Sequence, residues 1–306
     1  MPESLPYIGR TRLNELLPMI DAIDALDRAF AAGFPELPVR TVHPIDTGQL
    51  LLMPAWSDLG IGVKLITYSP DNAAQTLPTV QGVYVLFEPQ SARPVAMLDG
   101  SAITELRTAA VSAVATRHLS PPAASRLRLY GTGVQGRSHV RAMQAVRPIE
   151  VIHIVSGHQE NAVALASQLR GEGFDAFAVD PDGLIDADII CLTTTSPAPV
   201  IRASQLPTDV HINAIGAFQP HTRETDTQTV VSSSVYVEDR AAAMDEAGDL
   251  IIPEADGAWS RMEITADLHE VTSGFAPPRS GRTLFKGVGL PYEDLVIAAA
   301  AFRASV

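Results

Sequence analysis

The chain has few of the residues that define several large classes of protein. Its 306 residues include one cysteine, Cys191, so a disulfide framework within the chain is excluded and a cysteine-based metal site is not expected. Cys191 lies in the apolar run Ile189–Leu192, which predicts a buried core position. Charged residues make up 19% of the sequence and hydrophobic residues 46%, a balance typical of globular rather than disordered proteins.

Basic residues are scarce relative to acidic ones. The formal net charge is −13, whereas nucleic acid or an anionic membrane requires a basic face on its partner. We therefore expect neither as a partner, although a few arginines and lysines can still bind a small anion. The first residues show no basic segment followed by an apolar one, and no apolar run approaches the roughly 18 residues of a membrane-spanning helix. These absences predict a soluble, cytoplasmic protein.

The commonest hydrolase and metal signatures are also missing. The sequence contains no G-x-S-x-G elbow and no H-E-x-x-H pair. The acidic segment Asp245–Asp249 fits a helix end followed by a turn. The histidines show no metal-ligand spacing, and we expect surface or satisfied core positions for His43, His118, His139, His153 and His269. No metal site is therefore predicted.

The stretch from Leu127 to His139 is the most informative one. It reads as a strand, a tight turn and the start of a helix, and the turn contains Gly131, Gly133 and Gly136 in a G-x-G-x-x-G pattern. In this pattern the first glycine permits the turn, the second lets the backbone approach a pyrophosphate, and the third lets the helix pack on the strand. The helix N-terminus then faces the phosphates. The stretch predicts a dinucleotide-binding loop rather than an ordinary turn.

Before this loop, the pattern is that of an α+β region. Apolar residues at three- and four-residue steps predict a helix over 10–34, and a second helix is expected from about Ser101 to Leu119. Turn sequences separate short alternating segments, which indicate an antiparallel or mixed sheet with strands at 39–45, 49–53, 62–67, 82–87 and 94–98.

From Leu127 onward, strands and helices alternate. Strands are expected at 127–130, 151–155, 176–179, 188–193, 210–215 and 235–238, with helices at 135–146, 159–171 and, shorter, between the later strands. This alternation predicts a parallel sheet with right-handed crossovers. The alanine-rich segment 290–302 is expected to be a helix, but its position does not show which region it joins.

The segment after the second strand of this region bears on the choice of cofactor. An acid at this point normally holds the ribose 2′-hydroxyl of NAD, but the sequence here is Ser156-Gly-His158. The lack of a carboxylate removes repulsion of a 2′-phosphate, to which Ser156 and His158 could donate hydrogen bonds. We favour NADP(H), with NAD(H) possible. The alternative is a simple loop that accepts both cofactors.

Three basic residues stand among apolar residues in the first region. They are Arg40, Lys64 and Arg107. Burying an ammonium or guanidinium group is costly unless it meets an anion, which a structural salt bridge could also supply for any one of them. Three such positions in one region favour a site that binds a carboxylate, which arginine grips through two hydrogen bonds.

Several motifs form a specific combination between about residues 40 and 300: Leu52-Met-Pro-Ala55, Gly62-Val-Lys64, Leu77-Pro-Thr-Val-Gln-Gly82, Leu98-Asp-Gly100, Leu106-Arg-Thr-Ala-Ala110, Gly131-Thr-Gly-Val-Gln135, Ala187-Asp-Ile-Ile190, His211-Ile-Asn-Ala-Ile-Gly216 and Phe285-Lys-Gly-Val-Gly289. Together they resemble the ornithine cyclodeaminase/μ-crystallin family. The resemblance implies an α/β fold, in which a Rossmann-type dinucleotide-binding domain (121–282) is inserted into an α+β substrate-binding and dimerisation domain (1–120, completed by 283–306). It also implies a homodimer.

The resemblance further implies which residues form the site. Lys64 corresponds to a catalytic residue, and the substrate-binding positions are Arg40, Met53, Lys64, Arg107, Phe218, Gly287 and Val288. The cofactor-binding positions are Thr79, Arg107, Thr108, Gly131, Gly133, Val134, Gln135, Gly136, Ser156, His158, Thr194, Ile215, Gly216 and Ala217.

One departure from the family pattern bears on the reaction. Cyclodeaminases and the related alanine dehydrogenases carry an aspartate where this chain has Phe218, in Gly216-Ala-Phe-Gln-Pro220. Phenylalanine cannot accept a proton, hold a substrate ammonium or activate water. Cyclodeamination is therefore not expected, and the segment resembles the pyrroline-2-carboxylate reductase branch.

These observations predict NAD(P)H-dependent reduction of a cyclic ketimine carboxylate. The substrate would be Δ1-pyrroline-2-carboxylate, Δ1-piperideine-2-carboxylate or both, the product L-proline or L-pipecolate, and the proton donor Lys64 or a bound water. Two enzyme alternatives are an alanine-type amino-acid dehydrogenase and an ornithine cyclodeaminase. An alternative of another class is a non-catalytic, NADPH-dependent protein that binds a small ligand, like the crystallin.

Overall fold

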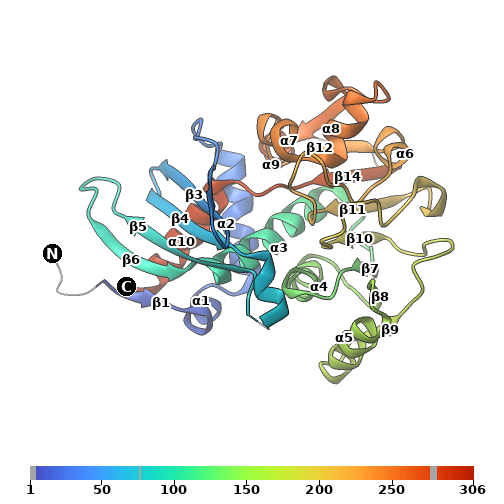
Figure 1. Ribbon diagram of the computed structural model, residues 1–306, viewed down its shortest axis with the longest axis horizontal. Coiled ribbons are helices and arrows are strands. Elements are labelled where there is room, and N and C mark those ends of the chain that lie inside the picture. Colours follow the sequence, from blue (N-terminus) through green and yellow to red (C-terminus); the bar gives the residue numbers. More distant parts are fainter. Residues whose placement is uncertain (1–4, 76, 276–280) are drawn as a thin grey trace. The chain divides into compact units, whose positions relative to one another are not determined.

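The computed structural model describes residues 5–75, 77–275 and 281–306. They form two compact units, each with its own sheet (Figure 1). Unit 1 consists of Met1–Arg107 and Leu290–Val306, and unit 2 of Thr108–Gly289. The helix α3 (Gly100–Leu119) continues through the division. The domain limits expected from the sequence, 1–120 with 283–306 and 121–282, stay a prediction.

Unit 1 is built on a sheet of strand order β1-β6-β5-β4-β3-β2, in which only the β1–β6 pair is parallel among the described strands. The strands are β1 (Tyr7–Ile8), β2 (Thr41–Ile45), β3 (Gly48–Ser57), β4 (Gly60–Tyr68), β5 (Val80–Phe87) and β6 (Pro94–Asp99). The alternating segments predicted from the sequence lie in β2 to β6. This part of the prediction is confirmed. Alternation of apolar and polar residues was informative because it is typical of a sheet with one buried face.

The helices of unit 1 differ from the prediction at one point. The single helix expected over 10–34 is wrong: α1 (Arg10–Leu16) ends before Pro18, which caps α2 (Met19–Ala32). Proline has no N–H to donate within a helix and its ring clashes with the preceding turn. A short 3-10 helix, η1 (Pro70–Gln75), follows β4, and α10 (Pro291–Ser305) closes the chain.

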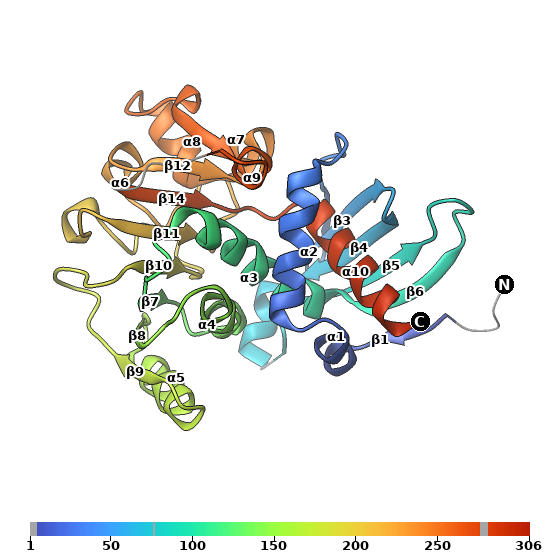
Figure 2. The same ribbon diagram turned by 180° about the vertical axis from the view of Figure 1, so that it is seen from behind.

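One face of this sheet is covered by helices. Helix α10 contacts β3, β4 and β5 and also packs on α2, as Figure 2 shows from behind. The register aligns Met53, Lys64, Tyr84 and Leu98 in one row across β3 to β6, and all four side chains are buried. A lysine is therefore built into the apolar inner face of the sheet.

Unit 2 contains a wholly parallel sheet of order β13-β12-β14-β11-β10-β7-β8-β9. The strands are β7 (Arg126–Tyr130), β8 (Val151–Val155), β9 (Asp175–Ala178), β10 (Ile189–Leu192), β11 (Val210–Ala214), β12 (Ser234–Val237), β13 (Ile264–Asp267) and β14 (Arg282–Lys286). The order β9-β8-β7-β10-β11 is that of a Rossmann sheet, which reverses its winding between β7 and β10. The predicted α/β fold class with a Rossmann-type unit is confirmed.

Helices connect these strands, as the alternation predicted. They are α4 (Val134–Val146), α5 (Gln159–Gly171), α6 (Thr227–Val231), α7 (Arg240–Glu246), α8 (Gly248–Ala255) and α9 (Leu268–Thr272), with 3-10 turns η2 (Ala203–Gln205) and η3 (Arg261–Glu263). Cys191 is buried, as predicted. None of the helices in the described part of the chain has the length and apolar character needed to cross a membrane.

Candidate functional site

The three glycines of the loop after β7 have different surroundings. Gly131 has φ +101°, and a Cβ there would lie 2.7 Å from the Thr193 carbonyl oxygen. A Cβ on Gly136 would lie 2.3 Å from the Gly131 carbonyl oxygen, so this glycine lets α4 pack on the turn. A Cβ on Gly133 would meet no atom within 4 Å, so the space above its backbone is open. A pyrophosphate needs such an open approach.

The start of α4 faces the same opening. Gly133 is the N-cap of this helix, and as a glycine it has no side chain to cap the first turn. Val134, the first helical residue, is 58% exposed. Unsatisfied amides at a helix N-terminus bind anions well. The predicted role of this loop in holding the phosphates of a dinucleotide stays a prediction.

The segment after β8 carries the two residues predicted to choose the cofactor. Ser156 is half-buried and His158 is exposed as the N-cap of α5. The Nδ1 atom of His158 lies 3.7 Å from Oε1 of Glu160, an acid in the first turn of α5 that was not considered from the sequence. The carboxylate that is missing directly after the strand is thus present four residues later.

A buried glutamate joins the loops that follow β10 and β11. Glu224 accepts hydrogen bonds from the backbone N and the hydroxyl of Thr194, both at 2.7 Å, and from the backbone N of Gly216 at 2.6 Å. Burial raises the pKa of Glu224. A Cβ on Gly216 would lie 2.1 Å from the Thr194 carbonyl oxygen, so only glycine allows this approach. The predicted cofactor positions Thr194 and Gly216 are therefore held together at the carboxyl edge of the sheet.

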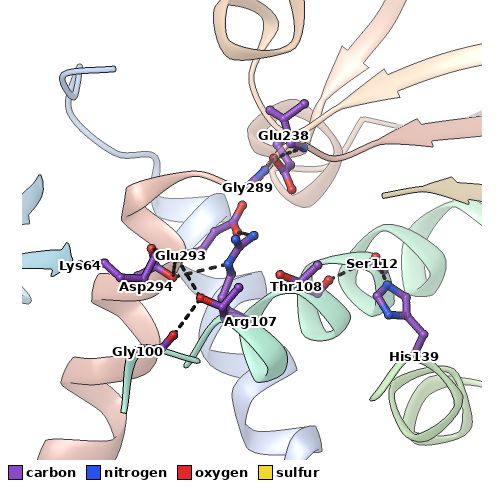
Figure 3. A network of polar contacts seen from close by, with 12 residues as sticks. Lys64, Gly100, Arg107, Thr108, Ser112, His139, Glu238, Gly289, Glu293 and Asp294 are labelled. Carbon is purple, nitrogen blue, oxygen red and sulfur yellow. Dashed lines mark hydrogen bonds and ion pairs between the residues drawn. The ribbon is translucent and has the colours of Figure 1, made fainter. Parts of the chain in front are cut away.

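A second buried glutamate holds the loop after β14. Glu238 accepts hydrogen bonds from the backbone N of Val288 at 3.0 Å and of Gly289 at 2.7 Å (Figure 3). A Cβ on Gly287 would lie 2.7 Å from Glu238 Oε1 and 2.9 Å from a side-chain carbon of Ile215. The loops that carry Ile215 and Gly287 are thus in contact within unit 2.

Phe218 lies in the loop between β11 and α6. Its side chain is 43% exposed, whereas the preceding Ala217 is buried, with its carbonyl oxygen bound by Lys286. The backbone before Phe218 is thus anchored while the ring reaches solvent.

Unit 1 contains a buried cluster of four charged residues. Lys64 is 1% exposed, and its Nζ donates hydrogen bonds to Asp294 Oδ1 at 2.8 Å and to the Thr104 hydroxyl at 3.2 Å. Arg107 Nη1 donates to Glu293 Oε2 at 3.0 Å, and Arg107 Nε lies 3.4 Å from Asp294 Oδ1. Figure 3 shows these side chains pointing toward one another. We call Lys64, Arg107, Glu293 and Asp294 the unit 1 ion cluster.

The two acids of the cluster were missed at the level of sequence. Glu293 and Asp294 are both fully buried in the first turn of α10. The signal was similar to that for Lys64: two adjacent charged residues precede the long apolar run Leu295–Phe302. The acids were overlooked because the sequence does not show which region α10 joins.

Two of the predicted basic residues, Arg40 and Arg107, affect the pKa of the third, Lys64. Burial lowers the pKa of Lys64 to about 8, Asp294 opposes this shift, and the positive charges of Arg107 and Arg40 add to it. Arg40 is half-buried just before β2. Burial, together with the charge of Asp294, raises the pKa of Tyr84, the neighbour of Lys64 on β5. The structure thus brings Arg40, Lys64 and Arg107 into one electrostatic environment.

Four further positions predicted from the sequence lie on or next to β3, β5, α3 and α4. Met53 pairs with Lys64 in the β3–β4 register. The carbonyl of Thr79, just before β5, accepts a hydrogen bond from Ser69 N. Thr108 belongs to unit 2, where it is buried and its carbonyl accepts a bond from the Ser112 hydroxyl. The roles of these residues, and of Gln135 in the first turn of α4, stay predictions.

Metal chemistry has no visible support. In the described segments, no group of His, Cys, Asp and Glu side chains is arranged to hold a metal ion. His139 is a satisfied core histidine, bonded to the Ser112 hydroxyl at 2.9 Å and the Gln135 carbonyl at 2.8 Å.

The chain is similar to proteins of one family over almost its whole length. It is 34% identical over 280 residues to a Δ1-pyrroline-2-carboxylate reductase of Bacillus cereus, covering 88% of this chain and 86% of the relative. It is 34% identical over 288 residues to the ketimine reductase mu-crystallin of Rattus norvegicus, covering 92% and 90%.

A solved structure agrees with these relatives. The Δ1-pyrroline-2-carboxylate reductase of Thermococcus litoralis, in complex with NADH and L-proline, matches with a TM-score of 0.92 and 30% identity, covering 98% of this chain and 97% of the other. The model of the ornithine cyclodeaminase/mu-crystallin family matches residues 9–303, which include nearly all of both units. The chain therefore belongs to the ornithine cyclodeaminase/mu-crystallin family.

Proposed function

We propose that this protein is an NAD(P)H-dependent ketimine reductase. Its substrate is a cyclic ketimine carboxylate, Δ1-pyrroline-2-carboxylate or Δ1-piperideine-2-carboxylate, and its product is L-proline or L-pipecolate. The relatives named as reductases of such imines support this reaction, as does the Thermococcus litoralis enzyme with NADH and L-proline. The strongest support within the chain is the unit 1 ion cluster with its buried lysine.

The charges around Lys64 suit a substrate with one carboxylate. Arg107 and Arg40 both lie close enough to Lys64 for their positive charges to lower its pKa. A carboxylate bound among cations favours their charged forms. A monocarboxylate supplies such a group, and arginine can bind it through two parallel hydrogen bonds.

Lys64 is suited to supply a proton to the imine nitrogen. Because the pKa of Lys64 is lowered to about 8, its ammonium is mostly protonated at neutral pH yet acidic enough to donate. A nicotinamide dinucleotide, when bound, would supply the hydride for C2, and Lys64 would supply the proton to the nitrogen, so that C=N would become CH–NH. Arg40 and Arg107 hold the carboxylate and thereby orient C2.

Phe218, in the loop after β11, supports imine reduction over the two alternative amino-acid reactions. Phenylalanine offers no group to hold a substrate ammonium or to activate water, which cyclodeamination and dehydrogenation of an open-chain amino acid both need. Its ring, 43% exposed, suits an apolar part of a cyclic imine.

The cofactor is a nicotinamide dinucleotide, with NADP(H) favoured. The open approach at Gly133 and the N-terminus of α4 beside it suit its pyrophosphate. Ser156 and His158 offer hydrogen bonds to a 2′-phosphate. Glu160 lies close to His158 and its negative charge favours NAD(H) instead, so the preference for NADP(H) is expected to be modest.

The protein forms a homodimer through the outer face of the unit 1 sheet. The register aligns Pro54, Val63, Val85 and Met97 on this face, and all four apolar side chains remain partly exposed. The face lies opposite the row that contains Lys64, which α10 covers. An apolar sheet face of this kind normally packs against another layer. Sedimentation analysis of the purified protein tests this assembly.

The reaction is tested by following NADPH and NADH oxidation with each cyclic imine. We expect turnover with at least one imine and loss of turnover in Lys64→Ala. Activity that depends on added ammonia would instead indicate an amino-acid dehydrogenase. Tight binding of the imine or its analogue pyrrole-2-carboxylate without oxidation of either cofactor would indicate a binding protein and reject the reductase.

A further inference from the structure

The acid pair at the start of α10 has no role in the reaction described above. Glu293 and Asp294 are fully buried, although the helix around them is almost wholly apolar. Carboxylates are seldom buried unless they are paired. Here they pair with Lys64 and Arg107, the two buried cations expected to bind the substrate.

The two acids differ in what they contact. Asp294 reaches both cations: its Oδ1 and Oδ2 lie 2.8 Å and 2.7 Å from Lys64 Nζ, and its Oδ1 lies 3.4 Å from Arg107 Nε. Glu293 accepts a hydrogen bond from Arg107 at 3.0 Å. Asp294 is thus the carboxylate that links the lysine of β4 to the arginine of α3 (Figure 3).

The hydrogen bonds of Lys64 leave room for a ligand. Among the described residues, its ammonium donates to two groups, Asp294 and Thr104, and an ammonium has three N–H donors. Asp294 and Thr104 therefore fix the position of Nζ without using all of its donors.

We propose that Asp294 is a positioning residue, whose carboxylate fixes the Lys64 ammonium on the inner face of the sheet and links it to Arg107. This role rests on the proposed reductase function, because it concerns the same two cations. Asp294 need not touch the substrate, since it acts through Lys64.

The charged groups around Lys64 determine what the loss of Asp294 would do. They are Asp294 and Glu293 on α10, Arg107 on α3, Arg40 before β2 and the Tyr84 hydroxyl on β5. Asp294 is the charge that raises the pKa of Lys64, whereas burial, Arg107 and Arg40 lower it. Without Asp294, Lys64 should lose its proton at a lower pH.

The test compares Asp294→Asn with Glu293→Gln, which removes the same charge from the neighbouring buried residue. The chain has only two lysines, Lys64 and Lys286, so selective ¹⁵N or ¹³C labelling of lysine gives two side-chain signals. We expect Asp294→Asn to lower the titration midpoint of Lys64 by about 1 to 3 pH units, the usual effect of one close charge. The Lys286 signal serves as an internal reference.

Kinetics supplies a second readout. The alkaline limb of kcat for imine reduction should move to lower pH in Asp294→Asn, by the same amount as the NMR midpoint. Glu293→Gln should raise KM through Arg107 and leave that limb in place. Asp294→Glu, which keeps the charge but displaces it, should lower kcat while retaining the wild-type pH dependence.

The outcomes separate this role from the proposed reaction. An unshifted Lys64 midpoint in Asp294→Asn, or an equal shift in Glu293→Gln, overturns the role of Asp294 whatever the enzyme does. If Asp294→Asn does not fold, a pH profile of Asp294→Glu that departs from the wild type overturns it. Failure of the wild type to reduce either imine rejects the reductase, while the NMR titration still decides whether Asp294 positions Lys64.

Discussion

The chain has two lysines, one in each unit, and both are buried beside an aspartate. Lys64 Nζ lies 2.7 Å from Asp294 Oδ2 in unit 1, and Lys286 Nζ lies 3.1 Å from Asp249 Oδ2 in unit 2. By burial and by partner type the two side chains are alike.

Their remaining contacts differ. Lys286 also donates to the carbonyl oxygens of Ala214 and Ala217, so three protein groups surround its ammonium. Lys64 donates to two groups and has Arg107 and Arg40 close enough to lower its pKa. A buried lysine is thus structural when the protein satisfies it fully. It is a candidate for ligand binding when fewer protein groups surround it and other cations lie close by.

The largest expected effect is on activity. Lys64→Met should reduce kcat/KM for imine reduction by about 10² to 10⁴, the usual contribution of a general acid. Its loss of stability should be smaller than that of Lys286→Met, because Arg107 still neutralises Asp294. Steady-state kinetics and urea unfolding of the two variants check this. Near-normal turnover in Lys64→Met would remove the distinction between the two lysines.

Lys286→Met should act mainly on stability. It leaves Asp249 buried without its cation, and Asp249 also accepts hydrogen bonds from the backbone N of Glu224 and Thr225. Breaking a buried ion pair in this way costs about 3 to 5 kcal/mol of unfolding free energy. Urea unfolding at neutral pH measures the change. A loss below about 1 kcal/mol would mean that water reaches Asp249 and replaces the lysine.

Unit 2 should also lose stability at acid pH. Burial lowers the pKa of His139 from 6.5 to about 4, so the folded state binds this proton less readily than the unfolded state. Its contribution is therefore present above pH 6.5 and is lost as the pH falls toward 4, by up to roughly 3 kcal/mol. Burial lowers the pKa of His211 to about 3 in the same unit, with the same sign.

His139→Gln removes one of these titrations. The unfolding free energy of this variant should depend less on pH between 6.5 and 4 than that of the wild type. Chemical unfolding at several pH values in this window provides the comparison. Parallel pH dependences in both proteins would show that His139 is not the acid-sensitive group of unit 2.

Much of the fold follows from local patterns. Alternation identified β2 to β6, and the strand-turn-helix pattern around Gly131 identified β7 and α4. The strand β14 was not predicted because it is short and carries Arg282 and Lys286 at its ends. It inserts between β11 and β12, which precede it in the chain, and this position is not readable from sequence order. Pro18 separates α1 from α2, but the apolar periodicity on both sides of it led to the prediction of one continuous helix.

The residues of the candidate site also differ in whether the sequence alone could identify them. Gly131, Gly133 and Gly136 could be interpreted from sequence because their spacing forms a short motif, although the atoms that crowd Gly131 belong to Thr193. Glu224 and Glu238 could not, since each binds backbone groups of strand-end loops that only the order of the sheet brings close.

The sequence by itself determined that this chain has a dinucleotide-type loop, three unusual basic residues and no aspartate at Phe218. These features depend on residue type and short-range spacing. Only the tertiary structure decided that Asp294 pairs with Lys64 across 230 positions and Glu293 with Arg107 across 186. No local pattern encodes such contacts, because they arise when α10 packs on the sheet of unit 1 and its acids must find cations there.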